Sequence, residues 1–136
     1  MGAWGHGIFD NDDACDYAAA IAESNDLSII EKTLDRVLET GPEYLEAPDA
    51  SEALAAADII ARLKGVYGEK NAYTETIDAW VARTKITPGP ELLDKARRSI
   101  DRITTEPSEL MELWKESADY SRWKLSLEQL VQRING

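Results

Sequence analysis

The sequence has little of the chemistry on which most catalytic and metal sites depend. It contains a single cysteine, Cys15, and a single histidine, His6. One cysteine excludes an intramolecular disulfide and a cysteine-rich zinc site, and one histidine cannot by itself hold a transition metal. Nucleophilic catalysis would require these two side chains to meet as a pair. The composition therefore favours a protein that needs no metal or cofactor and is not an enzyme.

Long apolar runs and early basic residues are also missing. No apolar run approaches the ~20 residues of a membrane-spanning helix. The first basic residue is Lys32, so the N-terminus lacks the positive segment of a secretory signal peptide. Acidic residues outnumber basic ones by 26 to 15, and the net charge of −11 repels nucleic acid and anionic lipid. We expect a cytoplasmic protein that binds neither nucleic acid nor membrane.

The sequence does contain a helical pattern of apolar residues. Its 136 residues, 43% of them hydrophobic, are enough for one core without disulfides or metals. Apolar residues recur with helical spacing along most of the chain, and no segment alternates as a strand flanked by hairpin turns would. The pattern predicts an all-α fold, a single compact domain of six to seven helices over residues 1–136. Residues 1–11, rich in glycine and carrying Trp4, are predicted to form an N-terminal arm packed on the helices.

Start and stop signals place the helices along the chain. Ser28 and Glu31 fit a capping box, Thr87 and Pro88 fit a cap followed by a first-turn proline, and Ser121 fits a final N-cap. The predicted helices begin near 12, 28, 49, 75, 87, 108 and 121, and they end near 23, 41, 65, 83, 103, 114 and 134.

The negative charge is concentrated in the first half of the chain. Residues 1–68 hold 14 acidic and four basic residues, net −10, whereas residues 69–136 hold 12 and 11, net −1. In the second half, opposite charges four residues apart are predicted to pair along one helix. These pairs are Glu91 with Lys95, Asp94 with Arg98, and Arg97 with Asp101. The uncompensated negative charge of the first half is expected to attract a cationic partner over about a Debye length, ~8 Å.

The most unusual segment is the arm together with the acidic helix start that follows it. One interpretation is purely structural: Trp4 anchors the arm, His6 is hydrogen-bonded, and the acids at 10–13 cap the first helix and complement its dipole. The other is that this segment binds a basic protein partner, as an immunity or adaptor protein would. The candidate binding residues are Trp4, His6, Asp10, Asp12, Asp13 and Asp16.

An enzyme remains the alternative hypothesis for the same acids. It would use the cluster from Asp10 to Asp16 for metal-assisted or carboxylate chemistry. The spacing does not match a helix-loop-helix calcium site, because the glycine and glutamate positions of that loop fall on Cys15 and Ile21. No metal is therefore expected, and the sequence gives no indication of an oligomeric state.

Asp58 stands alone as a charge in the apolar stretch 53–61. A buried carboxylate needs a partner, and Arg62 lies one helical turn further on. We expect these two side chains to form a structural ion pair.

The opening residues, MGAWGHGIFDND, resemble the signature of bacterial proteins grouped as domain of unknown function DUF4259. The stretches 52–61 and 108–114 resemble its internal blocks, and the resemblance spans most of the chain. It implies no established activity, so no functional residue is carried over from it.

Overall fold

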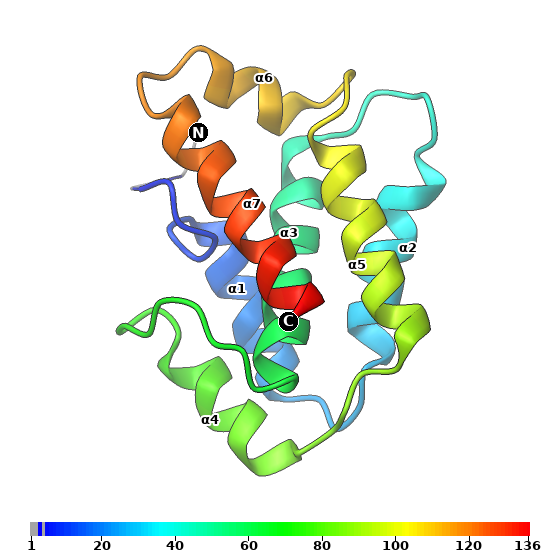
Figure 1. Cartoon of the computed structure of the whole chain (residues 1–136), viewed down its shortest axis with the longest axis vertical. Helices are drawn as coiled ribbons and strands as arrows, with labels where there is room; N and C mark the ends of the chain where they lie inside the picture. Colours follow the sequence, from blue (N-terminus) through cyan, green and yellow to red (C-terminus); the bar gives the residue numbers. More distant parts are fainter. Residues whose placement is uncertain (1–2, 4) are drawn as a thin grey trace.

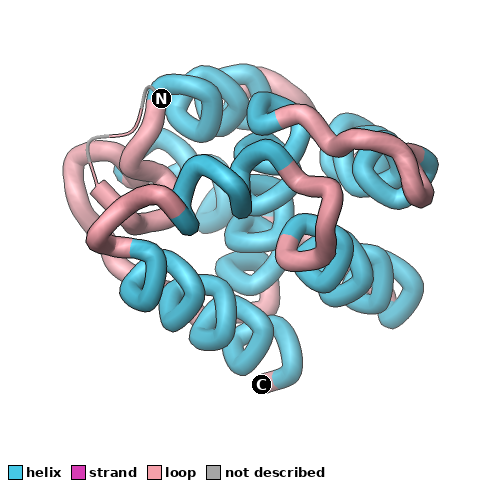
Figure 2. The backbone as a smooth tube through the Cα atoms, turned by 90° about the horizontal axis from the view of Figure 1, so that it is seen from above, coloured by secondary structure: helices cyan, strands magenta, loops and turns pink. Residues whose placement is uncertain are grey.

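Helices make up most of the computed structural model, which describes residue 3 and residues 5–136 (Figure 1). Within that part of the chain the helices are α1 (Asp12–Ala22), α2 (Ser28–Glu39), α3 (Ala47–Leu63), α4 (Glu75–Thr84), α5 (Pro90–Ile103), α6 (Glu109–Lys115) and α7 (Tyr120–Asn135). In the view from above, the described chain consists of helices and loops (Figure 2). The predicted fold class, a single all-α domain, is confirmed.

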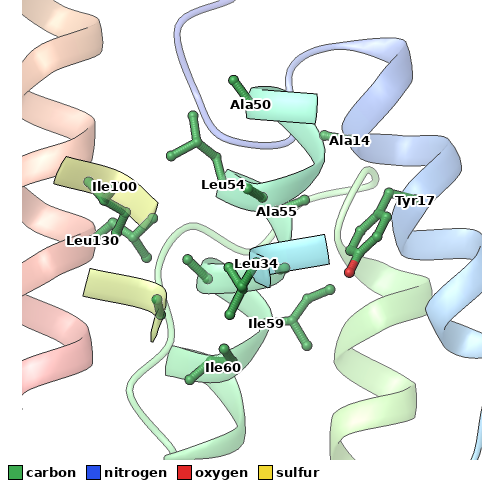
Figure 3. Packing of buried hydrophobic residues seen from close by; sticks show 14 of the residues in the cluster. Ala14, Tyr17, Leu34, Ala50, Leu54, Ala55, Ile59, Ile60, Ile100 and Leu130 are labelled. Carbon is green, nitrogen blue, oxygen red and sulfur yellow. The ribbon is translucent and has the colours of Figure 1, made fainter. Parts of the chain in front are cut away.

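α3 is the centre of the domain because it is apolar on nearly every side. Every residue from Ala53 to Arg62 is buried, and α3 contacts each of the six other helices. Around it lie Tyr17 of α1, Leu34 of α2 and, from the second half of the chain, Ile100 of α5 and Leu130 of α7 (Figure 3). A helix that is hydrophobic all round is stable only where neighbours cover every face.

α1 begins at a true N-cap. The Oδ1 atom of Asn11 accepts the backbone N–H of Ala14 at 2.8 Å, and its amide group donates to the carbonyl of Ile8 at 3.3 Å. Asn11 also forms an isolated antiparallel bridge with Ala3. One side chain thus closes the turn that precedes α1 and satisfies a backbone donor of its first turn.

Replacing this cap tests how much the start of α1 depends on it. We expect Asn11→Ala to lower the free energy of unfolding by about 1 kcal/mol, because the N–H of Ala14 loses its acceptor. Asn11→Ser, which keeps a capping oxygen, should recover most of the loss. Urea denaturation followed by circular dichroism measures both. Equal stability of Asn11→Ala and wild type would show that water caps the helix equally well.

Three predicted N-caps are wrong by one or two residues. Ser28 is not an N-cap: it is the first helical residue, and Asp26 accepts its backbone N–H at 3.0 Å and its hydroxyl at 2.7 Å. α5 begins at Pro90 rather than after Thr87, with Gly89 as its N-cap. Ser121 lies inside α7, which begins one residue earlier. In each case an equally suitable turn residue lay within three positions, so local propensity did not discriminate between them.

α3 starts two residues before its predicted beginning, for a reason that is not local. The backbone N–H of Ala47 donates to Oε1 of Glu109 at 2.7 Å, so a side chain of α6 satisfies the first turn of α3. Backbone bonds join the same two segments: the N–H of Leu45 donates to the carbonyl of Pro107 at 3.2 Å, and that of Glu109 donates to the carbonyl of Leu45 at 2.9 Å. These bonds hold the start of α6 beside the start of α3.

The predicted charge pairs of α5 are confirmed only in part. Arg98 Nε donates to Asp94 at 2.8 Å, as expected. Lys95 instead pairs with Asp35 of α2 at 2.9 Å, and Arg97 donates to the side chain of Asn135 at 3.0 Å. Packing against α2 and α7 therefore offers these bases partners that the sequence of α5 alone does not reveal. None of the helices in the described chain combines the length and the apolarity needed to span a bilayer.

Candidate functional site

The turn before α1 is built around the carboxylate of Asp10. Its Oδ2 atom accepts the backbone N–H of Gly7 at 3.0 Å. A Cβ atom placed on Gly5 or on Gly7 would lie 2.5 or 2.7 Å from that oxygen, closer than side-chain atoms approach one another. A side chain at either position would therefore force the Asp10 carboxylate to move, whereas the two glycines let the chain pass close to it. Asp10 is a candidate binding residue from the sequence, yet in the structure it is half-buried and organises the turn.

The other three acids of the cluster point into solvent. Asp12, Asp13 and Asp16 are exposed on α1 and have no ion-pair partner among the described residues. We call these three residues the α1 acidic face. Asp12 and Asp13 also lie in the first turn of the helix, where negative charge stabilises the dipole. Trp4, the other large candidate residue of this segment, lies outside the described residues.

His6 and Cys15 are each engaged in a hydrogen bond of their own. His6 Nδ1 lies 3.3 Å from the hydroxyl of Ser126, which connects the arm to α7, so the prediction of a hydrogen-bonded histidine is confirmed. The thiol of Cys15 donates to the carbonyl of Phe9 at 3.2 Å. Burial, followed by the nearby carboxylates of α1, raises the pKa of Cys15 and so disfavours the thiolate. Neither side chain is arranged as a nucleophile with its base.

The acids of the arm and α1 do not converge on a common point. Within residue 3 and residues 5–136, no three His, Cys, Asp or Glu side chains come together in a group that could hold a metal ion. Asp10 lines a cavity on one side of the arm, whereas Asp12 and Asp13 line a separate groove. The sequence cluster is therefore divided between two places in the fold.

The groove beside the α1 acidic face has an apolar floor. It has a volume of about 610 Å³ and lies between the N-terminal turn, the first half of α3, α6 and the start of α7. Its floor consists of buried apolar side chains from three helices: Leu54, Leu110, Trp114 and Trp123. The two tryptophan rings stack with centroids 6.0 Å apart and planes inclined by 10°. Its edge carries half-buried Leu113 and exposed Pro48.

The charge at the edge of this groove is entirely negative. Asp12, Asp13 and Glu109 are its charged lining residues, and none of the described residues that line it is basic. Glu109 also accepts the N–H of Ala47, so the two aspartates are the carboxylates left to a ligand. We call this feature the acidic groove.

A second polar centre lies inside the domain, around Asp58. Arg62 Nε donates to Oδ1 of Asp58 at 2.7 Å, and the predicted ion pair is confirmed. Arg133 of α7 approaches the same carboxylate with both terminal nitrogens, at 2.8 Å to Oδ1 and 3.2 Å to Oδ2. The side chains of Asp58 and Arg62 are only 4% and 1% exposed. One buried carboxylate thus connects the middle of α3 to the last turns of α7.

Arg62 has further partners beyond Asp58. Its terminal nitrogens donate to Asp78 of α4 at 2.6 Å and to the carbonyl of Glu69 at 2.7 Å. Burial alone would lower the pKa of the Arg62 guanidinium, but the charges and hydrogen bonds of Asp58 and Asp78 outweigh it and raise that pKa. Arg62 therefore stays charged. Neither Asp78 nor Arg133 could be predicted as a partner from the sequence, because both lie outside α3 and are distant from Arg62 along the chain.

Two aromatic rings and one glycine complete this centre. The guanidinium carbon of Arg62 lies 5.5 Å from the ring centroid of Phe9 and 5.8 Å from that of Tyr67. A Cβ atom on Gly68 would lie 2.5 Å from a terminal nitrogen of Arg133. The cavity beside the pair, about 130 Å³, is bordered by Asp58, Arg62 and Arg133 of this network and also by Asp10 and Glu69. The arrangement fixes the arm, α3, α4 and α7 relative to one another.

A comparison with protein families identifies the chain. The family model described as "Domain of unknown function (DUF4259)" matches residues 2–126. The chain belongs to the DUF4259 family. Searches among curated proteins and among solved structures gave no match. The resemblance seen in the sequence is therefore confirmed.

The DUF4259 match contains some of the features described above and omits one. The glycine turn, the α1 acidic face and every described residue that lines the acidic groove lie within residues 2–126. Asp58, Arg62 and Asp78 lie within it as well, but Arg133 lies beyond its end. In this DUF4259 protein the buried network therefore extends beyond the residues that the family model matches.

Proposed function

We propose that this DUF4259 protein is a non-enzymatic interaction domain, of the adaptor or immunity type, that binds a basic protein. The observation that supports the proposal is the α1 acidic face, because its three carboxylates are exposed and have no ion-pair partner among the described residues. Exposed charge of one sign accelerates encounter with a partner of the opposite sign and selects against wrong partners. The proposal keeps the cytoplasmic location that we expect from the sequence.

Several other acids of the first half are paired with basic side chains within the fold. Asp35 pairs with Lys95 at 2.9 Å, Asp49 and Glu52 lie 3.7 and 3.4 Å from Arg36, and Asp58 is bound by two arginines. The three acids of the α1 acidic face have no such partner among the described residues, and α1 itself carries no basic residue. This contrast supports an electrostatic binding role for that face.

The carboxylate-based enzyme is less well supported as a function for these acids. Asp10 uses an oxygen to hold Gly7 and lines a different cavity from Asp12 and Asp13. General acid and base catalysis requires groups within hydrogen-bond reach of one substrate atom or one bridging water. The division of the cluster favours binding over catalysis.

Neutralising the α1 acidic face tests the proposal. The immobilised wild-type protein is compared with Asp12→Asn/Asp13→Asn/Asp16→Asn in capturing proteins from a lysate of the source organism at low and at high salt. We expect a basic protein to be recovered by the wild type at low salt and to be lost at high salt. Because each exposed ion pair contributes about 0.2–1 kcal/mol, the triple variant should bind it about tenfold more weakly.

A matched control removes the same number of charges elsewhere. Glu91→Gln/Asp101→Asn/Glu128→Gln alters three exposed acids of α5 and α7, and we expect it to retain the partner. Equal loss in both triple variants would mean that net charge, and not the α1 acidic face, governs binding. Recovery that is independent of salt and of both variants would refute the proposed function.

A further inference from the structure

We infer that the acidic groove is the docking site for an apolar side chain of the basic partner, so that the partner segment combines leucine-like residues with flanking lysine or arginine. This inference rests on the proposed function and specifies what the partner must carry. An acidic surface alone would accept almost any basic protein. A groove beside that surface adds shape and apolar contact, from which selectivity can arise.

The floor of the groove has the chemistry of a protein core. Leu54, Leu110 and the stacked pair of Trp114 and Trp123 present apolar atoms from three different helices. Aromatic and aliphatic residues in a concave, largely desolvated site are the usual anchors of binding energy in interfaces. The volume of about 610 Å³ exceeds that of a single apolar side chain, so the groove has room for a segment of a partner protein.

The edge of the groove determines the sign of that partner. Asp12 and Asp13 are exposed at its rim, and no basic residue is found among its described lining residues. An anionic occupant, such as a phospholipid headgroup or a nucleic acid, would meet like charge at this rim. A basic occupant would pair with the aspartates while its apolar side chain enters the groove.

The surrounding backbone holds this site in shape. Glu109 of α6 caps the first turn of α3 through the N–H of Ala47, and Leu45 bonds to backbone groups on both sides of Ser108. Asn11 fixes the first turn of α1 on the opposite wall. Because hydrogen bonds connect these walls to the rest of the fold, the groove is preorganised, which reduces the entropy lost on binding.

Two synthetic peptides serve as probes for calorimetric titration. The first is a helix-forming peptide of about 14 residues of lysine and alanine with two leucines one turn apart. Its twin carries serine in place of both leucines. We expect the leucine peptide to bind the wild type at least about tenfold more tightly than its twin, and Asp12→Asn/Asp13→Asn/Asp16→Asn to weaken both peptides.

Blocking the groove should remove the preference for leucine. Leu113→Arg places a bulky cation at its edge, and Leu125→Arg makes the same change at an exposed position of α7 that does not line the groove. We expect Leu113→Arg to bind the two peptides equally and weakly, and Leu125→Arg to behave as wild type. If Leu113→Arg does not fold, Pro48→Arg at the exposed rim replaces it in the same comparison.

The outcomes separate the inference from the proposed function. Equal binding of both peptides, lost in the triple aspartate variant, would overturn the groove and leave the α1 acidic face as the binding surface. Peptide binding that is as tight in the triple aspartate variant as in the wild type, or no binding at all, would overturn both proposals.

Self-association abolished by Leu113→Arg would assign the groove to a second copy of this chain. Leucine-selective binding that is gained only in Trp4→Ala would assign it to the chain's own arm, and either result would contradict the inference.

Discussion

Asp58→Ala should lower the free energy of unfolding by about 3–5 kcal/mol. The reason is that the carboxylate of Asp58 neutralises both Arg62 and Arg133, and the side chain of Arg62 is only 1% exposed. Among the described residues, removing Asp58 would leave Arg62 with Asp78 as its one charged partner and would leave Arg133 with only the carbonyl of Val66. An uncompensated buried charge is far more costly than the loss of an exposed ion pair. Urea denaturation followed by circular dichroism measures the change.

α5 provides a matched control for this experiment. Asp94 and Arg98 have the same spacing and nearly the same distance, 2.8 Å against 2.7 Å, but their side chains are each 56% exposed. Asp94→Ala should therefore cost less than about 1 kcal/mol. Both substitutions place alanine inside a helix, so the change in helix propensity is the same. Similar losses for the two variants would contradict a stabilising role of burial in the Asp58 network.

Trp80→Ala should destabilise the domain by about 3–5 kcal/mol. Trp80 of α4 is fully buried, and its indole N–H donates to the carbonyl of Ser24 in the loop between α1 and α2 at 2.9 Å. The substitution would leave a large cavity and an unsatisfied carbonyl. Because tryptophan fluorescence would change with the substitution itself, unfolding should be followed by far-ultraviolet circular dichroism.

Two further variants separate the contributions of Trp80. Trp80→Phe keeps much of the ring volume but removes the indole donor, so we expect an intermediate loss of about 1–3 kcal/mol. Leu125→Ala, at a side chain that is 52% exposed, should change stability by less than about 0.5 kcal/mol. A Trp80→Ala protein as stable as Leu125→Ala would mean that α4 is not part of the cooperative core.

Much of the fold could be predicted because its signals are periodic and local. The apolar stretch from Ala53 to Ala61 predicts a central helix, and α3 is that helix. The helix start at Asp12 and the pairing of Asp58 with Arg62 also follow from spacing alone. The start of α3 could not be predicted, since Glu109 contacts Ala47 from 62 positions away in the sequence. Tertiary contacts of this kind leave no periodic trace.

The candidate site was predictable in its charge but not in its shape. The density of acids between Asp10 and Asp16 is visible in the sequence, and three of the four are exposed as a binding surface requires. The separation of Asp10 from Asp12, Asp13 and Asp16 depends on the turn around Gly5 and Gly7. The amino-acid composition does not reveal the shape of that turn. The groove could not be foreseen either, because its walls come from α1, α3, α6 and α7, and only their packing brings these segments together.

The bond between Arg133 and Asp58 makes the boundary of the family match different from the boundary of the folding unit. The match ends at residue 126, yet Leu127, Leu130 and Ile134 are buried, and the amino group of Lys64 donates to the carbonyl of Ile134. A fragment cut at residue 126 would expose the side of α3 that α7 covers and leave Asp58 with half of its charge partners. Domain swaps or shortened versions based on the family limits would therefore divide a single cooperative unit.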